Sequence, residues 1–195
     1  MNKLLIGALC LMGIAATSVS AETYKGYEMP PFIVVSQGEE YELRDYQPHT
    51  LATVTLSGSV QQTASRGFRA LAGYIFGGND AGQKIAMTVP VQQTPDGQGH
   101  SVSFMMPGRY ALETLPKPEA SNITFERTEA ERRAVVTFSG YATGTVLRRR
   151  AAQLRDHLAR DGLTVLSGPH YAYYDDPFTL PWKRRNEVAF KVVPN

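Results

Sequence analysis

Alternating and helical patterns of apolar residues divide the chain into segments of predictable structure. Residues 32–46 and 50–56 have the β-branched, aromatic and alternating character of strands. Residues 63–76 carry apolar side chains at the spacing of an amphipathic helix, namely Ala64, Phe68, Leu71, Ala72 and Ile75. Two more strands are expected at residues 84–91 and 101–106. The first half therefore has the predicted order strand, strand, helix, strand, strand.

The second half repeats this order. We expect strands at residues 123–127 and 134–139, a helix at 146–160, and strands at 170–174 and 188–193. Val54-Thr-Leu-Ser-Gly58 and Val136-Thr-Phe-Ser-Gly140 lie 82 residues apart, and each precedes a predicted helix. Because strands cluster between the helices, the pattern predicts an α+β fold. We expect a distorted antiparallel β-barrel of two pseudo-symmetric ββαββ halves, each with one long helix.

The first 21 residues have the pattern of a secretory signal peptide. Lys3 precedes an apolar run over residues 4–16, and small residues lead up to Ala21. This run of 13 residues is shorter than the roughly 20 needed for a helix to span a bilayer. We therefore expect cleavage after Ala21 in preference to an uncleaved anchor. Residues 22–195 would form a single exported domain, periplasmic or secreted, without a membrane span.

Charge and cysteine content narrow the classes of partner. The chain has 20 Lys and Arg against 18 Asp and Glu, a net charge of +2. This surplus of basic residues is too small to indicate binding to the phosphates of a nucleic acid. The single cysteine, Cys10, lies in the predicted signal peptide, so the exported domain has no thiol for a disulfide or a thiolate metal site. We expect a monomer that does not bind nucleic acid.

The sequence lacks the common catalytic motifs, which predicts a binding protein and not an enzyme. The sequence has no Gly-x-Ser-x-Gly, His-Glu-x-x-His or Walker motif. Its four histidines lie in unrelated contexts, and no two are three to five residues apart as in common zinc motifs. Asp175-Asp176 precedes Pro177 and indicates a turn.

Two segments are candidate binding elements. The first helix combines its apolar stripe with Arg66 and Arg69, and its small residues Gly67 and Gly73 permit the close approach of a flat partner. The alternative is that this stripe is ordinary core facing the sheet. The long aromatic segment from Tyr171 to Trp182 favours a binding lid over a simple hairpin. The alternative is that its aromatic side chains fill one end of the barrel.

Several motifs resemble those of the SOUL haem-binding protein family, in the right order over residues 24–193. They are Tyr41-Glu-Leu-Arg-Asp-Tyr46, Tyr74-Ile-Phe-Gly-Gly-Asn-Asp80, Lys84-Ile-Ala-Met-Thr-Val-Pro-Val91, Phe138-Ser-Gly140 and Arg185-Asn-Glu-Val188. The resemblance implies non-covalent binding of haem or a related tetrapyrrole in an apolar cleft beside the first helix. It also implies a distorted barrel of two halves.

Carried onto this chain, the resemblance implies a site formed by the first helix and the loop between the last two strands. The residues concerned are Phe68, Ala72 and Ile75 from the helix and Tyr174 and Trp182 from the loop. Basic residues on that helix are thought to meet the haem propionates in the family, but the matching positions here are Ser65 and Gly73. The nearest cations, Arg66 and Arg69, are the candidates for that role.

Axial ligation of the haem iron stays open at this stage. No histidine lies in the first helix, which leaves His49 and His170 as candidate ligands. A Cys-x-x-Cys-His motif is absent, so c-type attachment is excluded. The alternative functions are a binding module for another amphipathic small molecule, because the duplicated fold also resembles bacterial drug-sensing domains, and an enzyme acting on tetrapyrroles or esters.

Overall fold

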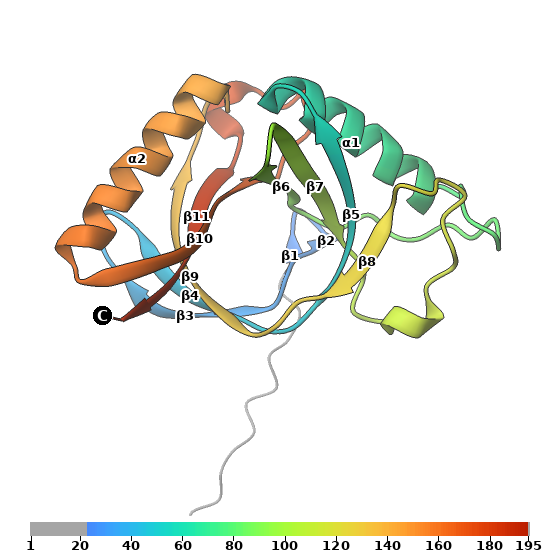
Figure 1. The fold of residues 1–195 in the computed structure, drawn as a ribbon, viewed down its shortest axis with the longest axis horizontal. Coiled ribbons are helices and arrows are strands. Elements are labelled where there is room, and N and C mark those ends of the chain that lie inside the picture. Colours follow the sequence, from blue (N-terminus) through green and yellow to red (C-terminus); the bar gives the residue numbers. More distant parts are fainter. Residues whose placement is uncertain (1–22, 195) are drawn as a thin grey trace, which may run out of the picture.

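The computed structural model describes residues 23–194, so the predicted signal peptide of residues 1–21 lies outside the described residues. These residues form an α+β fold with a nine-stranded antiparallel sheet and two long helices (Figure 1). The strand order is β3-β4-β9-β11-β10-β6-β7-β5-β8, and a short hairpin pairs β1 with β2. The strands are β1 Thr23–Tyr24, β2 Tyr27–Glu28, β3 Phe32–Gln37, β4 Glu42–Tyr46, β5 Thr50–Ser57, β6 Val91–Asp96, β7 Gly99–Met105, β8 Thr124–Arg127, β9 Glu131–Phe138, β10 Leu163–Tyr173 and β11 Asn186–Pro194. The helices are α1 Val60–Ile75 and α2 Gly144–Arg160, with short 3₁₀ turns η1 Leu112–Thr114 and η2 Pro181–Lys183.

The strand order supports the predicted duplication. Without β3, the order is symmetric about the β6–β10 pair, with β4, β5, β6 and β7 equivalent to β8, β9, β10 and β11. The first strand of each half pairs across the symmetry axis, β4 with β9 and β8 with β5. In the matching pentapeptides, Gly58 and Gly140 both have positive φ angles, +127° and +100°, where glycine is favoured. The repeated sequence therefore places a glycine with a positive φ angle shortly before each helix.

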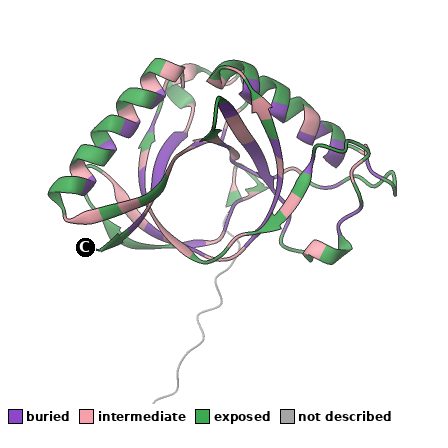
Figure 2. Ribbon diagram, viewed as in Figure 1, coloured by how far each residue is buried: buried purple, intermediate pink, exposed green. Residues whose placement is uncertain are grey.

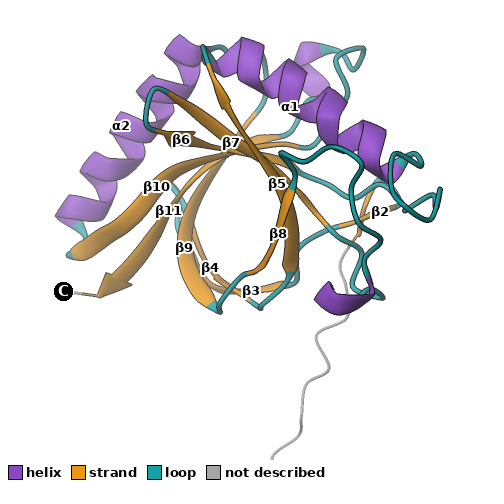
Figure 3. Ribbon diagram, turned by 45° about the vertical axis from the view of Figure 1, so that its right-hand side comes forward, coloured by secondary structure: helices purple, strands orange, loops and turns teal. Residues whose placement is uncertain are grey.

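The sheet is strongly curved but open. Figures 1 and 3 show both helices on its outer, convex face. Among the described strands β3 and β8 are the two edges, and no ladder joins them. The predicted α+β class and antiparallel sheet are confirmed, whereas closure of the sheet into a barrel is not.

Each helix covers its own hydrophobic core. Ser59 caps the start of α1 in a reciprocal capping box with Gln62, and Thr143 caps the start of α2. The α1 core is formed by Leu71, Tyr74 and Ile75 with Ala52, Val54, Val102 and Phe104 of the sheet. The α2 core is formed by Leu147, Leu154 and Leu158 with Ala134, Val188 and Phe190. Figure 2 shows these buried stripes facing the sheet while the outer faces of both helices are exposed.

One predicted strand is wrong. Residues 84–90 form no strand, and β6 begins only at Val91. The backbone N–H of Ile85 donates to Ile75 O at the end of α1, and that of Val89 donates to Glu28 O beside β2. Backbone hydrogen bonds to a helix end and to a hairpin therefore hold this segment, in place of the regular bonds between two strands. The side chains of Ile85 and Val89 are both buried.

Candidate functional site

The α1 residues predicted to bind a ligand lie along one edge of the helix. At about 100° per residue, Phe68, Ala72 and Ile75 fall within about 60° of one another. Ile75 and Ala72 are buried, whereas Phe68 is 41% exposed. The Phe68 ring packs edge-on against Phe104 of β7, with centroids 5.6 Å apart. Phe68 is therefore the apolar member of this set that offers surface to a ligand, and Ala72 and Ile75 support it from below.

The two arginines of α1 face different directions. The Arg66 guanidinium donates to Ser57 O at the end of β5, at 3.3 Å, and lies about 160° around the helix from Phe68. Arg69 is exposed and lies about 100° from Phe68. At Gly73 no atom lies within 4 Å of the position that a Cβ would take. By the same measure Gly73 lies about 140° around the helix from Phe68, close to the direction of Arg66. The helix therefore presents an aromatic ring with Arg69 as the nearer cation, whereas Arg66 and the open space at Gly73 belong to another face.

The loop between β10 and β11 displays large apolar side chains to solvent. The carboxylate of Asp176 accepts hydrogen bonds from the backbone N–H groups of Phe178 and Thr179, which confirms the turn predicted there. Trp182 lies in η2 and is 68% exposed, and Phe178 is 94% exposed. The alternative that the aromatic side chains of this segment fill one end of the barrel therefore does not hold for these two residues.

A hydrogen bond links this loop to the segment before α2, and the start of α2 lies beside that of α1. The N–H of Gly140 donates to Pro181 O at 2.8 Å, just before α2. At Gly144, the first residue of α2, a Cβ would lie 3.8 Å from Oε1 of Gln61 in the first turn of α1. Figure 1 shows η2 beside the point where the two helices begin. Trp182 thus belongs to the same end of the molecule as the start of α1.

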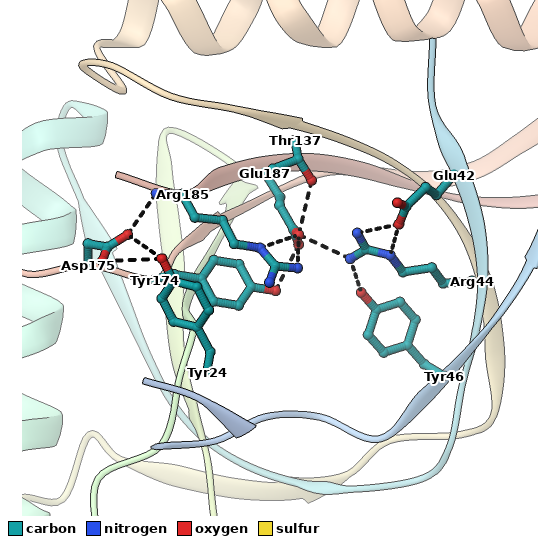
Figure 4. Close-up of polar contacts among 9 residues, drawn as sticks. All are labelled: Tyr24, Glu42, Arg44, Tyr46, Thr137, Tyr174, Asp175, Arg185 and Glu187. Carbon is teal, nitrogen blue, oxygen red and sulfur yellow. Dashed lines mark hydrogen bonds and ion pairs between the residues drawn. The ribbon is translucent and has the colours of Figure 1, made fainter. Parts of the chain in front are cut away.

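Tyr174, the other predicted loop residue, points to the opposite side of the sheet. Its hydroxyl donates to Glu187 Oε2 at 2.8 Å, and its side chain is buried (Figure 4). Burial and the neighbouring Glu187 carboxylate raise the pKa of Tyr174 well above its usual value, so the hydroxyl stays protonated and donates. Tyr174 therefore anchors the base of the loop, apart from the exposed face of α1.

Glu187 is the centre of a buried ionic cluster that sequence reasoning missed. Its Oε1 accepts from Arg44 Nη1 at 3.1 Å, from Arg185 Nη2 at 2.6 Å and from Thr137 Oγ1 at 3.3 Å. We call Arg44, Thr137, Tyr174, Arg185 and Glu187 the Glu187 cluster (Figure 4). Burial opposes the charge on Arg44, but the Glu187 carboxylate holds the pKa of this guanidinium above its ordinary value. A usable signal was the alternation of Glu42, Arg44 and Tyr46, which puts all three on one face of a strand.

A second ionic contact ties the N-terminal hairpin to the same loop. Asp175 Oδ1 lies 2.5 Å from Lys25 Nζ, and its Oδ2 accepts from the backbone N–H of Arg185 at 2.7 Å. Burial works against ionisation of Asp175, but these donors hold the pKa of its carboxyl below the usual value. The Asp175 carboxylate therefore joins β1 and β2 to both ends of the loop.

The two candidate axial histidines lie away from α1. His49 is buried, with Nδ1 2.8 Å from Gln47 O and no partner for Nε2. His170 Nδ1 lies 3.0 Å from Thr94 Oγ1, and its Nε2 lies 3.2 Å from Ser167 Oγ. Burial lowers the pKa of His170 to about 4, which makes the ring neutral near pH 7. Within residues 23–194, no group of three or more His, Cys, Asp and Glu side chains is arranged to hold a metal ion.

An internal cavity on the concave side of the sheet is small. It measures about 20 Å³, and its lining includes Tyr46, Arg133, His170, Tyr174 and Glu187. This volume holds about one water molecule. A larger, open depression of about 380 Å³ is lined by Asp45, Glu131, Arg132 and residues 192–194, among others.

Comparison with known proteins gives a consistent family match. The family described as SOUL heme-binding protein matches residues 27–191. Heme-binding protein 1 of Sus scrofa is 30% identical over 171 residues, covering 81% of this chain and 89% of that protein. Heme-binding protein 2 of Mus musculus is 29% identical over 174 residues, covering 83% and 84%.

Solved structures with the same fold are more distant in sequence. The EcmrR C-terminal domain superposes with a TM-score of 0.63 at 14% identity, covering 80% of this chain and 99% of that one. A structure titled as a hydrolase from Listeria innocua gives a TM-score of 0.57 at 13% identity, covering 82% and 94%. At these identities the likeness concerns the fold alone. Neither helix in residues 23–194 is long and apolar enough to cross a bilayer.

Proposed function

Because the chain belongs to the SOUL heme-binding protein family, we propose that it binds haem or a related tetrapyrrole without covalent attachment, on the outer face of α1. The family match over residues 27–191 is the observation that carries this proposal. The relatives named as heme-binding proteins align over most of their own length, which supports carrying the ligand class to this chain.

The size and lining of the two pockets favour α1 as the location. Ligand pockets for small molecules measure about 300–1,000 Å³, and the internal cavity of about 20 Å³ cannot admit a macrocycle. The open depression of about 380 Å³ has one cation among the described residues that line it, Arg132, and that guanidinium is already paired with Asp45 at 2.6 Å, so no free cation there meets the propionates of haem. The exposed side of α1 has neither of these obstacles.

Each α1 residue has a distinct part in the proposed site. The half-exposed Phe68 ring stacks on the macrocycle, and Ala72 and Ile75 continue the apolar edge beneath it. Arg69 is the proposed partner for a propionate, since Arg66 is already engaged by Ser57 O. The open space at Gly73 lies about 140° around the helix from Phe68 and is not part of this site. Trp182 would cover the ligand only if the loop leans toward Phe68, and Tyr174 acts indirectly by anchoring that loop.

We propose no axial ligand from α1, which has no histidine. If haem binds beside α1, its iron would have no ligand from this helix. The Nε2 of His49 has no hydrogen-bond partner, but its ring lies beside Gln47 and Thr128 and not on α1. Replacing His49 and His170 singly tests whether either coordinates the iron.

The protein is proposed to bind or carry its ligand and not to transform it. His170 has a serine neighbour, but its other ring nitrogen meets the Thr94 hydroxyl and not a carboxylate, unlike the orienting group of a catalytic triad. The low pKa of His170 also makes it a weak base at neutral pH. A different amphipathic small molecule is the alternative ligand, which native mass spectrometry of protein purified from its own source would identify.

Export and a monomeric state are further proposals. Cleavage after Ala21 would release residues 22–195 into the periplasm or the medium, as the apolar run of residues 4–16 suggests. N-terminal sequencing of protein from fractionated cells tests the cleavage. Light scattering of the purified product tests the monomeric state.

The decisive experiment is titration of hemin into residues 22–195 at micromolar concentration, followed by the Soret band. We expect a shifted, saturable band with one hemin per chain, and a weaker response for Phe68→Ala. Thr55→Ala serves as the control, because this exposed side chain lies on β5 and not on α1. A spectrum identical to that of free hemin at every protein concentration would sink the proposal.

A further inference from the structure

Four large apolar side chains are exposed on two adjoining segments at the end of the molecule where both helices begin (Figure 1). Tyr141 precedes α2, and Phe178, Leu180 and Trp182 belong to the loop between β10 and β11. Phe178 is 94% exposed and Trp182 is 68% exposed, and Tyr141 and Leu180 are also exposed. We call these four residues the aromatic rim. Exposed apolar side chains that gather in this way mark an interaction site more often than isolated ones do.

The backbone beneath the aromatic rim is firmly held. Arg184 donates from Nε to Thr179 O at 2.7 Å and from Nη2 to Pro177 O at 2.6 Å. Its guanidinium also lies 5.4 Å from the centre of the Tyr141 ring, which connects the loop to the start of α2. Because these bonds fix the loop while leaving Phe178 and Trp182 in water, the fold displays the two rings at a cost in solvation.

The segments around the aromatic rim carry a surplus of positive charge. Residues 140–150 and 176–185 contain six basic residues and one acidic residue, Asp176. Three of the basic side chains are exposed, namely Arg148, Arg149 and Lys183, whereas Arg185 is paired with Glu187 and Arg184 is bonded to its own loop. Neither helix has an acidic residue in its first turn, so the partial positive charge of both helix starts is left unopposed. The Asp176 carboxylate is already engaged by backbone N–H groups of its own turn.

We propose that the aromatic rim docks the protein on an anionic lipid bilayer. Phe178 and Trp182 would enter the interfacial region, where aromatic side chains are enriched, while Lys183 and Arg149 would lie at the headgroups. Basic residues next to a membrane surface each add attraction to anionic lipids. This inference goes beyond the proposed binding of haem and does not depend on it.

A lipid surface fits the cluster better than a protein partner does. Protein interfaces of standard size bury about 800 Å² per partner and are depleted of lysine and of charge in their core. The aromatic rim consists of four side chains on two adjacent segments with basic residues on both. This combination of a small apolar tip and flanking cations is typical of interfacial membrane binding.

The chain provides its own reporter for this proposal, because Trp182 is its only tryptophan. Haem-free protein is mixed with vesicles of phosphatidylglycerol and phosphatidylcholine, and with vesicles of phosphatidylcholine alone. We expect a blue shift of Trp182 emission and quenching by brominated acyl chains with the anionic vesicles, and a much smaller response with the neutral ones. High salt should weaken the binding, because it screens the attraction of the cations.

Two variants and a matched control locate the contact. Phe178→Ser should lower the partition coefficient about tenfold, given the free energy of burying a phenylalanine, and Lys183→Glu should also lower it. Phe76→Ser is the control: Phe76 is 62% exposed but follows the last residue of α1, about 24 Å along the helix from its start. It should bind vesicles like the unmodified protein. Circular dichroism verifies that each variant is folded.

Trp182 emission that does not change with anionic vesicles would overturn the proposal, and so would an equal loss of binding in the Phe76→Ser variant. The hemin titration is run in parallel on the same preparation. Hemin binding without vesicle binding refutes the membrane proposal alone, and vesicle binding without hemin binding refutes the haem proposal alone.

Discussion

Gly67 of α1 lies directly on Val102 of β7, so close that a Cβ on Gly67 would be 2.5 Å from the Cβ of Val102. The Val102 side chain fills the space between strand and helix, and the helix backbone rests on it because Gly67 has no side chain. The close approach that Gly67 permits is therefore to the sheet and not to a ligand. Gly73, six residues further along the same helix, has open space around the same position. The two glycines of α1 thus serve different purposes.

Replacing each glycine by alanine should change stability in opposite directions. Gly67→Ala should lower the free energy of unfolding by about 1–3 kcal/mol, because the β-branched Val102 cannot move aside within a packed core. Gly73→Ala should raise it by up to about 1 kcal/mol, since alanine favours the helix and meets no neighbour. Urea denaturation of both variants measures these differences. A Gly67→Ala protein as stable as the unmodified chain would show that α1 does not rest on β7 as described.

The Glu187 cluster should be among the most sensitive polar sites of the fold. Glu187→Gln removes the buried carboxylate of the pair and leaves the Arg44 guanidinium with Glu42 alone, at 2.6 Å. We expect a loss near the lower end of the roughly 3–5 kcal/mol that breaking one side of a buried ion pair costs. The Asp45–Arg132 pair is the matched control, since both side chains are more than a third exposed. Asp45→Asn should cost less than about 1 kcal/mol. Equal losses in the two variants, measured by urea denaturation, would contradict a buried role for Glu187.

The order of helices and strands could be predicted largely from sequence, because apolar residues recur in both halves at the spacings typical of strands and helices. The α1 stripe predicted a helix over 63–76, which the structure extends to Val60–Ile75. The prediction of a strand at residues 84–90 was wrong, because the alternating pattern indicates only that Ile85 and Val89 are buried. It does not distinguish a ladder from backbone bonds to a helix end and a hairpin. Closure of the barrel failed for a related reason, because the pairing of distant edge strands leaves no local pattern.

The candidate site could be predicted only in part. Periodicity placed Phe68, Ala72 and Ile75 on one edge of a helix, but it could not say that Phe68 alone stays half exposed. Tyr174 and Trp182 share one loop in sequence, yet they lie on opposite sides of the sheet because Tyr174 bonds to Glu187. The Glu187 cluster joins residues 143 positions apart. Such a contact depends on the strand order β4-β9-β11, which no local motif records.

Stability should fall in acid through a contribution from His170. Burial lowers the pKa of this ring to about 4, whereas the unfolded chain has a value of about 6.5. The unfolded state therefore binds more protons between these two values, so this contribution is fully present above about pH 6.5 and is lost as the pH falls toward 4. The charges that act on the ring are those of Arg133, Glu131 and Lys191.

The His170→Asn variant isolates this contribution from that of other groups, because asparagine does not titrate and can still bond to Thr94. The stability of the unmodified protein relative to the variant should decrease by on the order of 3 kcal/mol between pH 7 and pH 4. Urea denaturation at a series of pH values gives this difference. A difference that stays constant over the series would mean that His170 is not buried in its neutral form.

The two arginines of α1 should contribute unequally to hemin binding. Arg69 is exposed beside the apolar edge, so Arg69→Glu replaces attraction for a propionate by repulsion and should weaken hemin binding about three- to tenfold at low salt. This range corresponds to roughly 0.6–1.4 kcal/mol, as expected for an exposed ion pair. Arg66→Glu makes the same change of charge, but the Arg66 guanidinium is directed toward Ser57 O at the end of β5. It should therefore affect affinity less, and added salt should reduce the gap between the two variants. Soret titrations at two salt concentrations measure both effects, and an equal loss in both variants would show that the helix attracts hemin through its overall charge and not through Arg69.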